Sequence, residues 1–190
     1  PELSGRPERI AIVGAGTGSG KTLAFYLPAM AVMAEQARPG HSRVHTLALY
    51  PRTELLRDQL REALSSIQAI EPALQRNGRR PLRIGVLYAD TPWTPHELDD
   101  SNTRRTGSAR RWHRRSGGVI CPFLTCPHCS DGELLWNTAD REAGSERLVC
   151  LGCRKVVPPG RLALTRRSLQ DNPPDLLFTT TEMLNRNGSS

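Results

Sequence analysis

The chain has 190 residues, of which 37% are hydrophobic and 24% are charged, and its formal net charge is +7. This length favours one domain with a small insertion, and the composition excludes a wholly disordered chain. No apolar run approaches the length of a membrane-spanning helix, and the first residues lack the pattern of a secretory signal. We therefore expect a cytoplasmic protein without a membrane partner.

Almost all of the excess charge comes from one segment. Six arginines and no acidic residue lie between Thr103 and Gly118, whereas the rest of the chain carries 20 basic and 19 acidic residues. Such a run attracts phosphate, chiefly in nucleic acid, and Trp112 within it could stack on a base. The alternatives are a solvated loop and a packed tryptophan, and the sequence leaves both open.

Short apolar runs alternate with helical patterns on both sides of a polar middle segment. We expect strands at 9–13, 44–50, 82–88 and 175–179, and helices at 21–37, 53–70, 162–170 and 182–187. This alternation predicts an α/β fold with a parallel sheet flanked by helices. On the first helix, the residues expected to face the core are Leu23, Leu27, Met30, Ala31 and Ala34.

The polar middle segment interrupts this pattern. Residues 89–118 have no hydrophobic period and are predicted to form a long loop or to be partly disordered, and a cysteine-bearing unit follows. We therefore divide the chain into a first α/β part, an arginine-rich loop, a small insertion and a continuation of the α/β part. Their ranges are 1–89, 90–118, 119–160 and 161–190.

A glycine-rich segment follows the first expected strand and opens the first expected helix, which is the context of a phosphate-binding loop. Glycines allow backbone N–H groups to approach phosphate oxygens. Lys21 would contact the β- and γ-phosphates of ATP, and the Thr22 hydroxyl would bind Mg²⁺, so these two are the candidate catalytic residues. The candidate nucleotide-binding residues are Ala15, Gly16, Thr17, Gly18, Ser19, Gly20, Lys21 and Thr22. Ala15 departs from the strict pattern, and a turn without a ligand is the alternative.

Five cysteines lie between Cys121 and Cys153. Four of them form two C-x2-C pairs separated by 20 residues, which is the spacing of a zinc ribbon; these are Cys126, Cys129, Cys150 and Cys153. Four thiolates leave no open position on Zn²⁺, so the site is expected to be structural. Cys121 is left over as a free thiol or an alternative ligand, and His128 is expected to be a bystander.

Three segments together resemble superfamily 2 helicases of the DEAD/DEAH kind. AGTGSGKT at 15–22 is similar to their motif I, YPRTELLRDQ at 50–59 to motif Ia, and PPDLLFTTTEML at 173–184 to the motif Ib region. The resemblance implies a RecA-like domain, here incomplete and carrying a zinc-ribbon insertion. It also implies ATP with Mg²⁺, nucleic acid with DNA favoured over RNA, and a second RecA-like domain in the parent protein. The residues of these motifs most resemble those of large bacterial helicases of DNA-modification or defence loci, such as DpdJ-like proteins.

The resemblance also supplies candidate nucleic-acid contacts, which are Arg52, Thr53, Thr180 and Thr181. Arg52 stands where threonine is common in motif Ia, and Thr181 stands where proline is common in motif Ib. For the threonines, helix capping is the alternative role.

The sequence contains no D-E-x-H/D motif, which holds Mg²⁺ and aligns water in these helicases. We therefore expect an ATP-binding portion of an ATP-dependent helicase or translocase that is not competent alone. The alternative is a zinc-dependent nucleic-acid-binding module whose phosphate loop is vestigial and which has no ATPase activity.

Overall fold

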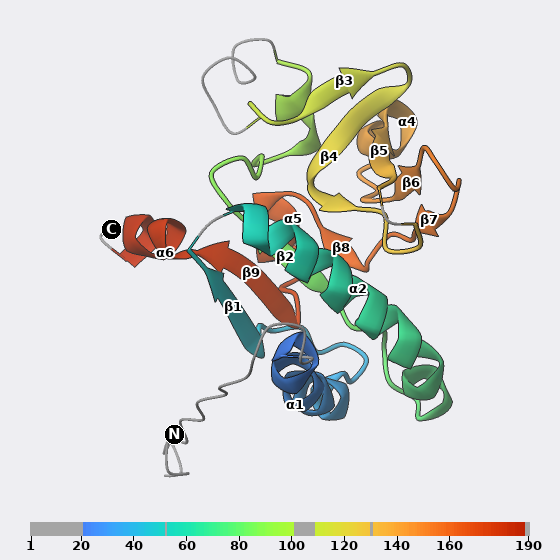
Figure 1. Cartoon of the computed structure of the whole chain (residues 1–190), viewed down its shortest axis with the longest axis vertical. Helices are drawn as coiled ribbons and strands as arrows, with labels where there is room; N and C mark the ends of the chain where they lie inside the picture. Colours follow the sequence, from blue (N-terminus) through green and yellow to red (C-terminus); the bar gives the residue numbers. More distant parts are fainter. Residues whose placement is uncertain (1–20, 52, 101–108, 130, 189–190) are drawn as a thin grey trace.

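The computed structural model describes residues 21–51, 53–100, 109–129 and 131–188. Within them the chain forms a parallel sheet of four strands and an antiparallel sheet of five. Figure 1 shows the parallel sheet beside helices α1 (Lys21–Gln36) and α2 (Thr53–Arg76), with the antiparallel sheet toward one end of the molecule. None of the described helices is long and apolar enough to cross a membrane.

The parallel sheet has the strand order β1–β9–β2–β8, so β9, from the end of the chain, lies between two strands from its first half. The strands are β1 (Thr46–Tyr50), β2 (Ile84–Leu87), β8 (Leu162–Ala163) and β9 (Leu176–Thr180). The strands expected at 44–50, 82–88 and 175–179 are therefore confirmed as members of one parallel sheet. The strand expected at 9–13 lies outside the described residues.

The helix expected at 162–170 is wrong at its beginning. Leu162 and Ala163 pair with β2 as a short strand, and helix α5 covers only Arg166–Asp171. The Thr165 hydroxyl accepts a hydrogen bond from the backbone N–H of Ser168, which sets the start of the helix at this point. The apolar residues before it are extended and buried at the edge of the sheet.

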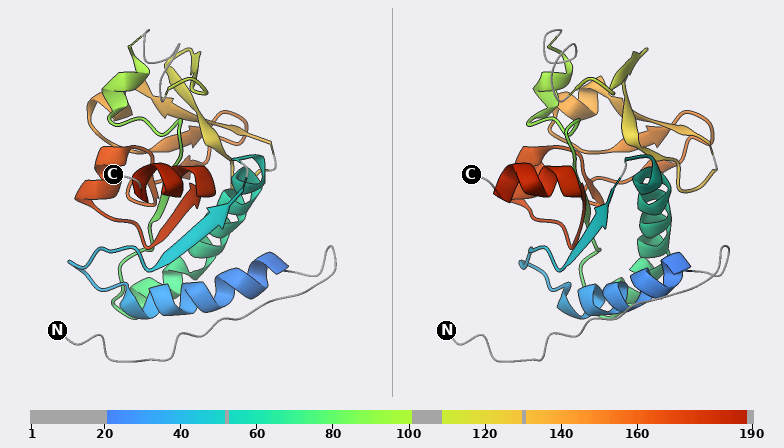
Figure 2. Two further views of the ribbon diagram at one scale, coloured as in Figure 1. Left: turned by 90° about the vertical axis from the view of Figure 1, so that its left-hand side faces the viewer. Right: turned by 60° about the vertical axis from the view of Figure 1, so that its left-hand side comes forward.

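Helices lie on both sides of the parallel sheet, although Leu47 and Leu49 of the edge strand β1 remain 44% and 45% exposed. In Figure 2, α2 lies on one side of the sheet, and α5 and α6 (Thr181–Gly188) lie on the other. The alternation along β2 agrees with this, because Ile84 and Val86 join the core that α2 covers. A side chain at Gly85 would instead collide with Leu169 of α5, so only glycine fits there. A parallel sheet flanked by helices fits a RecA-like fold.

The first helix packs through a different face from the one expected. Tyr26, Met30, Met33 and Ala37 are buried, whereas Leu27 is 58% exposed. Ala31 is also exposed and Ala34 is half-buried, so only Met30 of the predicted core residues with a described side chain is fully buried. The helix is apolar on several sides, and periodicity therefore could not indicate which side meets α2. It also continues through Pro28, as α2 continues through Pro72 beyond its predicted end at 70.

The antiparallel sheet forms between β2 and β8 in the sequence, with strands in simple chain order. We call β3 to β7, with helix α4, the cysteine unit. Its elements are β3 (His113–Arg115), β4 (Gly118–Thr125), β5 (Glu133–Asn137), α4 (Thr138–Glu142), β6 (Leu148–Cys150) and β7 (Val156–Val157).

The expectation of one long loop over 89–118 is wrong for its described residues. A 3-10 helix, η1, covers Pro95–Leu98, and β3 pairs with β4 as a hairpin around Gly117. Trp112 is 3% exposed and meets the Phe123 ring edge-on, with ring centroids 5.4 Å apart. The packed alternative is therefore correct for this tryptophan, and no face of it is free for a base.

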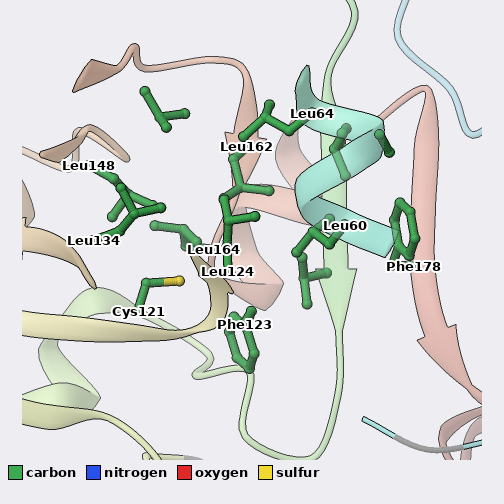
Figure 3. Close-up of a cluster of buried hydrophobic side chains, with 14 of the residues drawn as sticks. Leu60, Leu64, Cys121, Phe123, Leu124, Leu134, Leu148, Leu162, Leu164 and Phe178 are labelled. Atoms are coloured by element: carbon green, nitrogen blue, oxygen red, sulfur yellow. The ribbon is translucent and has the colours of Figure 1, made fainter. Parts of the chain in front are cut away.

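The cysteine unit and the parallel sheet share one hydrophobic core. Leu60 and Leu64 of α2 belong to the same buried cluster as Leu124 of β4, and Figure 3 shows these side chains on facing elements. Leu162 and Leu164, at the edge of the parallel sheet, extend the cluster. Because the apolar surface is continuous, the two sheets stabilise each other.

A buried ion pair also joins the two parts. Glu146, from the loop before β6, lies 3.0 Å from the Arg83 guanidinium, and both side chains are 8% exposed. The other Glu146 oxygen accepts hydrogen bonds from the backbone N–H groups of Leu164 and Thr165. Ser168 of α5 donates a further hydrogen bond of 2.6 Å to Glu146. A carboxylate satisfied in this way tolerates burial, and it fixes the loop of the cysteine unit against the end of β8.

Candidate metal centre and carboxyl edge of the parallel sheet

Four cysteines converge at one end of the cysteine unit. The sulfur atoms of Cys126, Cys129, Cys150 and Cys153 all lie within 4.8 Å of one another. Two of the separations, Cys126–Cys153 and Cys129–Cys150, are 3.6 Å. Four sulfurs bound to one Zn²⁺ at the usual bond length stand about 3.8 Å apart in a tetrahedron. The donor set and its spacing therefore fit a tetrahedral metal ion.

The local backbone explains why these sulfurs meet. Cys126 follows β4 and its N–H donates to the Gly132 carbonyl, which closes the first knuckle at 2.9 Å. Cys150 ends β6, and its sulfur accepts from the backbone N–H of Cys153 at 3.4 Å. In the first knuckle the Cys126 sulfur likewise accepts from the His128 N–H at 3.3 Å. Backbone N–H groups directed at sulfur favour the thiolate form that a metal requires.

Gly132 is the glycine on which this arrangement depends. A Cβ at this position would collide with the Cys150 sulfur and stand 2.8 Å from the Cys129 sulfur. At Gly152 the nearest atoms would be at ordinary contact distances, beginning at 3.8 Å. Of these two glycines, only Gly132 is required for steric reasons.

Cys121 and His128 stand apart from the four sulfurs. Neither belongs to the group of possible metal ligands found among the described residues. Cys121 lies on β4 with no exposed surface, and burial raises the pKa of its thiol to about 12. His128 is exposed. For Cys150, burial acts to raise the pKa, but hydrogen bonds from the Cys153 N–H and neighbouring thiols lower it to about 7.

The second candidate site lies where the parallel strands end. β1 ends at Tyr50 directly beside Thr180, the last residue of β9, and α2 and α6 begin within three residues of these ends. The predicted motif Ia and Ib segments are thus neighbours at the carboxyl edge of the sheet. In open parallel sheets, ligands bind outside this edge.

The described threonines at this edge have different surroundings. Thr180 is 8% exposed, and its hydroxyl accepts a 3.4 Å hydrogen bond from the Met183 N–H, in the manner of a helix cap. Thr181 is exposed. The geometry therefore favours capping for Thr180 and leaves Thr181 accessible. Arg52 and the side chain of Thr53 lie outside the described residues.

The nucleotide-binding prediction falls largely outside the described residues. Residues 15–20 are among those not described, as are the side chains of Lys21 and Thr22. The described part of α1 starts at Lys21, so the last two residues of the predicted loop, Lys21 and Thr22, have a helical backbone.

The arginine-rich segment meets acidic residues from elsewhere in the chain. Arg111 lies 3.2 Å from Asp90, Arg114 lies 3.3 Å from Asp99, and Arg115 lies 3.4 Å from Glu133. These arginine side chains remain more than half exposed. Arg104 and Arg105 lie outside the described residues. Sequence reasoning missed these pairs because the acids are distant in the chain.

Sequence reasoning also missed the buried groups Arg83, Glu146 and Asp175. The Asp175 carboxylate is fully buried and receives two hydrogen bonds from the Arg80 guanidinium, at 2.7 and 2.8 Å. It also accepts from the backbone N–H of Arg83. No motif marks such groups. The only available signal was an acidic residue at the start of an apolar strand, in Asp175-Leu176-Leu177-Phe178.

Comparison with known proteins gives one family match. The model for the DEAD/DEAH box helicase family matches residues 3–84, and this match supports the helicase superfamily. A domain of this kind suggests a nucleic-acid helicase type of ATP-binding function. No curated protein and no solved structure matches the chain.

Proposed function

We propose that this chain is the ATP-binding N-terminal portion of an ATP-dependent helicase or translocase acting on nucleic acid. The observation that carries the proposal is the helicase family match over 3–84, which spans the segments similar to motifs I and Ia. The pairing of Tyr50 with Thr180 supports it, because it brings the motif Ia and Ib segments to one edge of the sheet.

Each predicted residue then has a role set by its chemistry. The backbone N–H groups of residues 15–20 would surround the phosphates, and the Lys21 ammonium would neutralise the β- and γ-phosphates. The Thr22 hydroxyl would hold Mg²⁺, which supplies the charge needed for phosphoryl transfer. Arg52, Thr53, Thr180 and Thr181 are proposed to contact the nucleic-acid backbone, with DNA favoured over RNA.

Two finer parts of the proposal depend on the sequence more than on the fold. Zn²⁺ is the metal proposed for the four cysteines, because four thiolates in a closed tetrahedron are typical of structural zinc. The likeness to DpdJ-like helicases of DNA-modification and defence loci rests on the residues that make up the three motifs. The D-E-x-H/D motif absent from these 190 residues, and a second RecA-like domain, would belong to the parent protein.

The chain contains only two lysines, and this gives a matched test of the phosphate loop. Lys21→Ala is expected to abolish binding of ATP-Mg²⁺, since the ammonium contacts only the ligand, and to leave the circular dichroism unchanged. Lys155→Ala removes the other lysine, which is exposed on the turn before β7, and is expected to bind as the wild type does. Isothermal titration calorimetry of the three proteins decides the question.

The same titration distinguishes the proposed ATP-binding function from the alternative function. A wild-type chain that binds nucleic acid but shows no heat with ATP-Mg²⁺ would support a zinc-dependent binding module with a vestigial loop. Equal ATP affinity in the wild type and Lys21→Ala would contradict the assignment of the loop.

A further inference from the structure

A basic groove lies where α2 meets the first strands of the cysteine unit. It is a cavity of about 370 Å³, and Arg57, Arg111, His113 and Glu133 stand around it. Pro122 of β4 also lines the cavity, and in Figure 1 this strand passes beside the first turns of α2. We call it the α2–β3 groove. Side chains far apart in the sequence thus converge on one opening.

The charge around the groove is predominantly positive. Arg57 is exposed and forms no ion pair with the residues that the structure describes. The two acids nearby already face arginines, since Asp90 lies beside Arg111 and Glu133 lies beside Arg115. The Glu133–Arg115 pair is exposed on both sides, and such pairs contribute little to stability, whereas Asp90 beside Arg111 is only 16% exposed.

The position of the groove connects it to the carboxyl edge of the parallel sheet. Arg57 stands about one helical turn after the start of α2 at Thr53, next to the strand ends Tyr50 and Thr180. Arg61, one turn further along α2, stands at a neighbouring cavity of about 290 Å³ that the first cysteine knuckle also lines. Arg57 and Arg61 therefore lie in line along α2 between the sheet edge and the cysteine unit, and Glu62 is the acidic residue at the second cavity.

The chemistry around the groove suits phosphate better than bases. Guanidinium groups bind phosphate oxygens through paired hydrogen bonds. The aromatic side chains nearby are turned into the core, because Trp112 is 3% and Phe123 is 5% exposed. Without a free ring face to stack on, a base gains little here.

We propose that the α2–β3 groove binds the phosphate backbone of nucleic acid. The groove would extend the nucleic-acid contacts proposed at the carboxyl edge of the parallel sheet onto the cysteine unit. This inference rests on the proposed function. The cysteine unit would then serve as a binding surface held in place by its metal. Contacts to phosphate carry no base information, so binding through the groove is expected to be independent of sequence.

The test is the salt dependence of binding. The double variant Arg57→Gln/Arg111→Gln removes two exposed positive charges from the groove. The matched control, Arg38→Gln/Arg76→Gln, removes two exposed charges just after α1 and at the end of α2. Fluorescence anisotropy of the metal-loaded chain with a labelled single-stranded DNA gives the slope of log affinity against log salt.

We expect the groove variant to reduce this slope by about 1.4, since each phosphate contact on a single strand contributes about 0.7. Affinity at fixed salt should fall about tenfold, whereas the control should retain most of the wild-type slope. Arg57→Lys/Arg111→Lys keeps the charge and should recover the slope, which separates a loss of charge from a loss of fold.

Failure of the inference differs from failure of the proposed function. If the wild type binds DNA and ATP but the groove variant keeps the wild-type slope, the groove is excluded and the proposed function stands. An equal loss of slope in the groove and control variants would show that the charge effect is not specific to the α2–β3 groove, and would exclude the groove as the binding site. If the wild type binds neither ATP nor DNA, the proposed function falls, and the inference falls with it.

Discussion

The parallel sheet and the cysteine unit gain their stability in different ways. Strands β1, β2 and β9 are short apolar segments held by pairing with one another, and helices lie on both sides of the sheet that they form. Three strands of the cysteine unit are very short, since β3 and β6 have three residues each and β7 has two. The four cysteine sulfur atoms converge at one end of the unit. A sheet this small does not usually bury enough surface to fold alone, so it needs both a cross-link and a neighbour.

The structure supplies both of these to the cysteine unit. Four sulfurs at metal-binding distances close one end, and the shared core with α2 together with the Glu146–Arg83 pair holds it against the parallel sheet. The insertion is therefore integrated into the domain. This predicts that disrupting the cysteine unit also lowers the stability of the parallel sheet.

Of the changes predicted here, loss of the metal should lower the stability of the cysteine unit the most. We expect about one zinc per chain, and Cys126→Ser should lose it and unfold the cysteine unit, because metal binding supplies folding free energy of about 10 kcal/mol or more in small zinc sites. Elemental analysis and thermal melting followed by circular dichroism check this. Cys121→Ser is the matched control and should keep its zinc, with a lower melting temperature from a polar group in the core.

Two outcomes would contradict the account of the metal centre. One is a metal-free wild-type protein with the same circular dichroism as a zinc-loaded one. The other is loss of metal in Cys121→Ser as readily as in Cys126→Ser, which would show that the ligand set is wrong.

Breaking the buried ion pair should have a smaller effect. Glu146→Gln leaves the Arg83 guanidinium buried without its counter-charge, which typically costs about 3–5 kcal/mol. Urea unfolding measures the loss. Glu142→Gln, on the exposed end of α4, is the control and should change the free energy of unfolding by less than about 0.5 kcal/mol. Similar stability of the two variants would mean that the pair does not hold the units together.

The two parts also differ in how far the sequence could predict them. The β1, β2 and β9 strands and the long amphipathic helix α2 follow from local hydrophobic patterns, which a sheet with covered faces imposes directly. The buried face of α1 could not be predicted from the hydrophobic pattern, because Phe25, Leu27 and Val32 make the exposed side of this helix apolar as well. β3 consists of three exposed polar residues, and β8 has only two residues, so neither shows a period.

The candidate sites show the same contrast. The C-x2-C spacing indicated four cysteines that the structure brings together, since each pair needs only one tight turn and Gly132 leaves room for the sulfurs. The α2–β3 groove had no signature, because Arg57 and Arg111 are 54 positions apart and meet only when β4 packs on α2. Glu146 was missed for the same reason.

The most direct test of the whole account is a thermal melt with and without ATP-Mg²⁺. Nucleotide at 100 times its dissociation constant stabilises the folded chain by about 2.7 kcal/mol, which raises the melting temperature of a domain this size by about 5–10 °C. Trp112 and Trp136 are buried beside and within the cysteine unit, whereas Trp93 is 47% exposed, so the melts use a Trp93→Phe background. The fluorescence of the two remaining tryptophans should shift together with the far-ultraviolet circular dichroism when ATP-Mg²⁺ is added, and neither signal should shift once Lys21→Ala is introduced. An unchanged wild-type melt would contradict ATP binding, and a shift in circular dichroism alone would contradict the integration of the two parts.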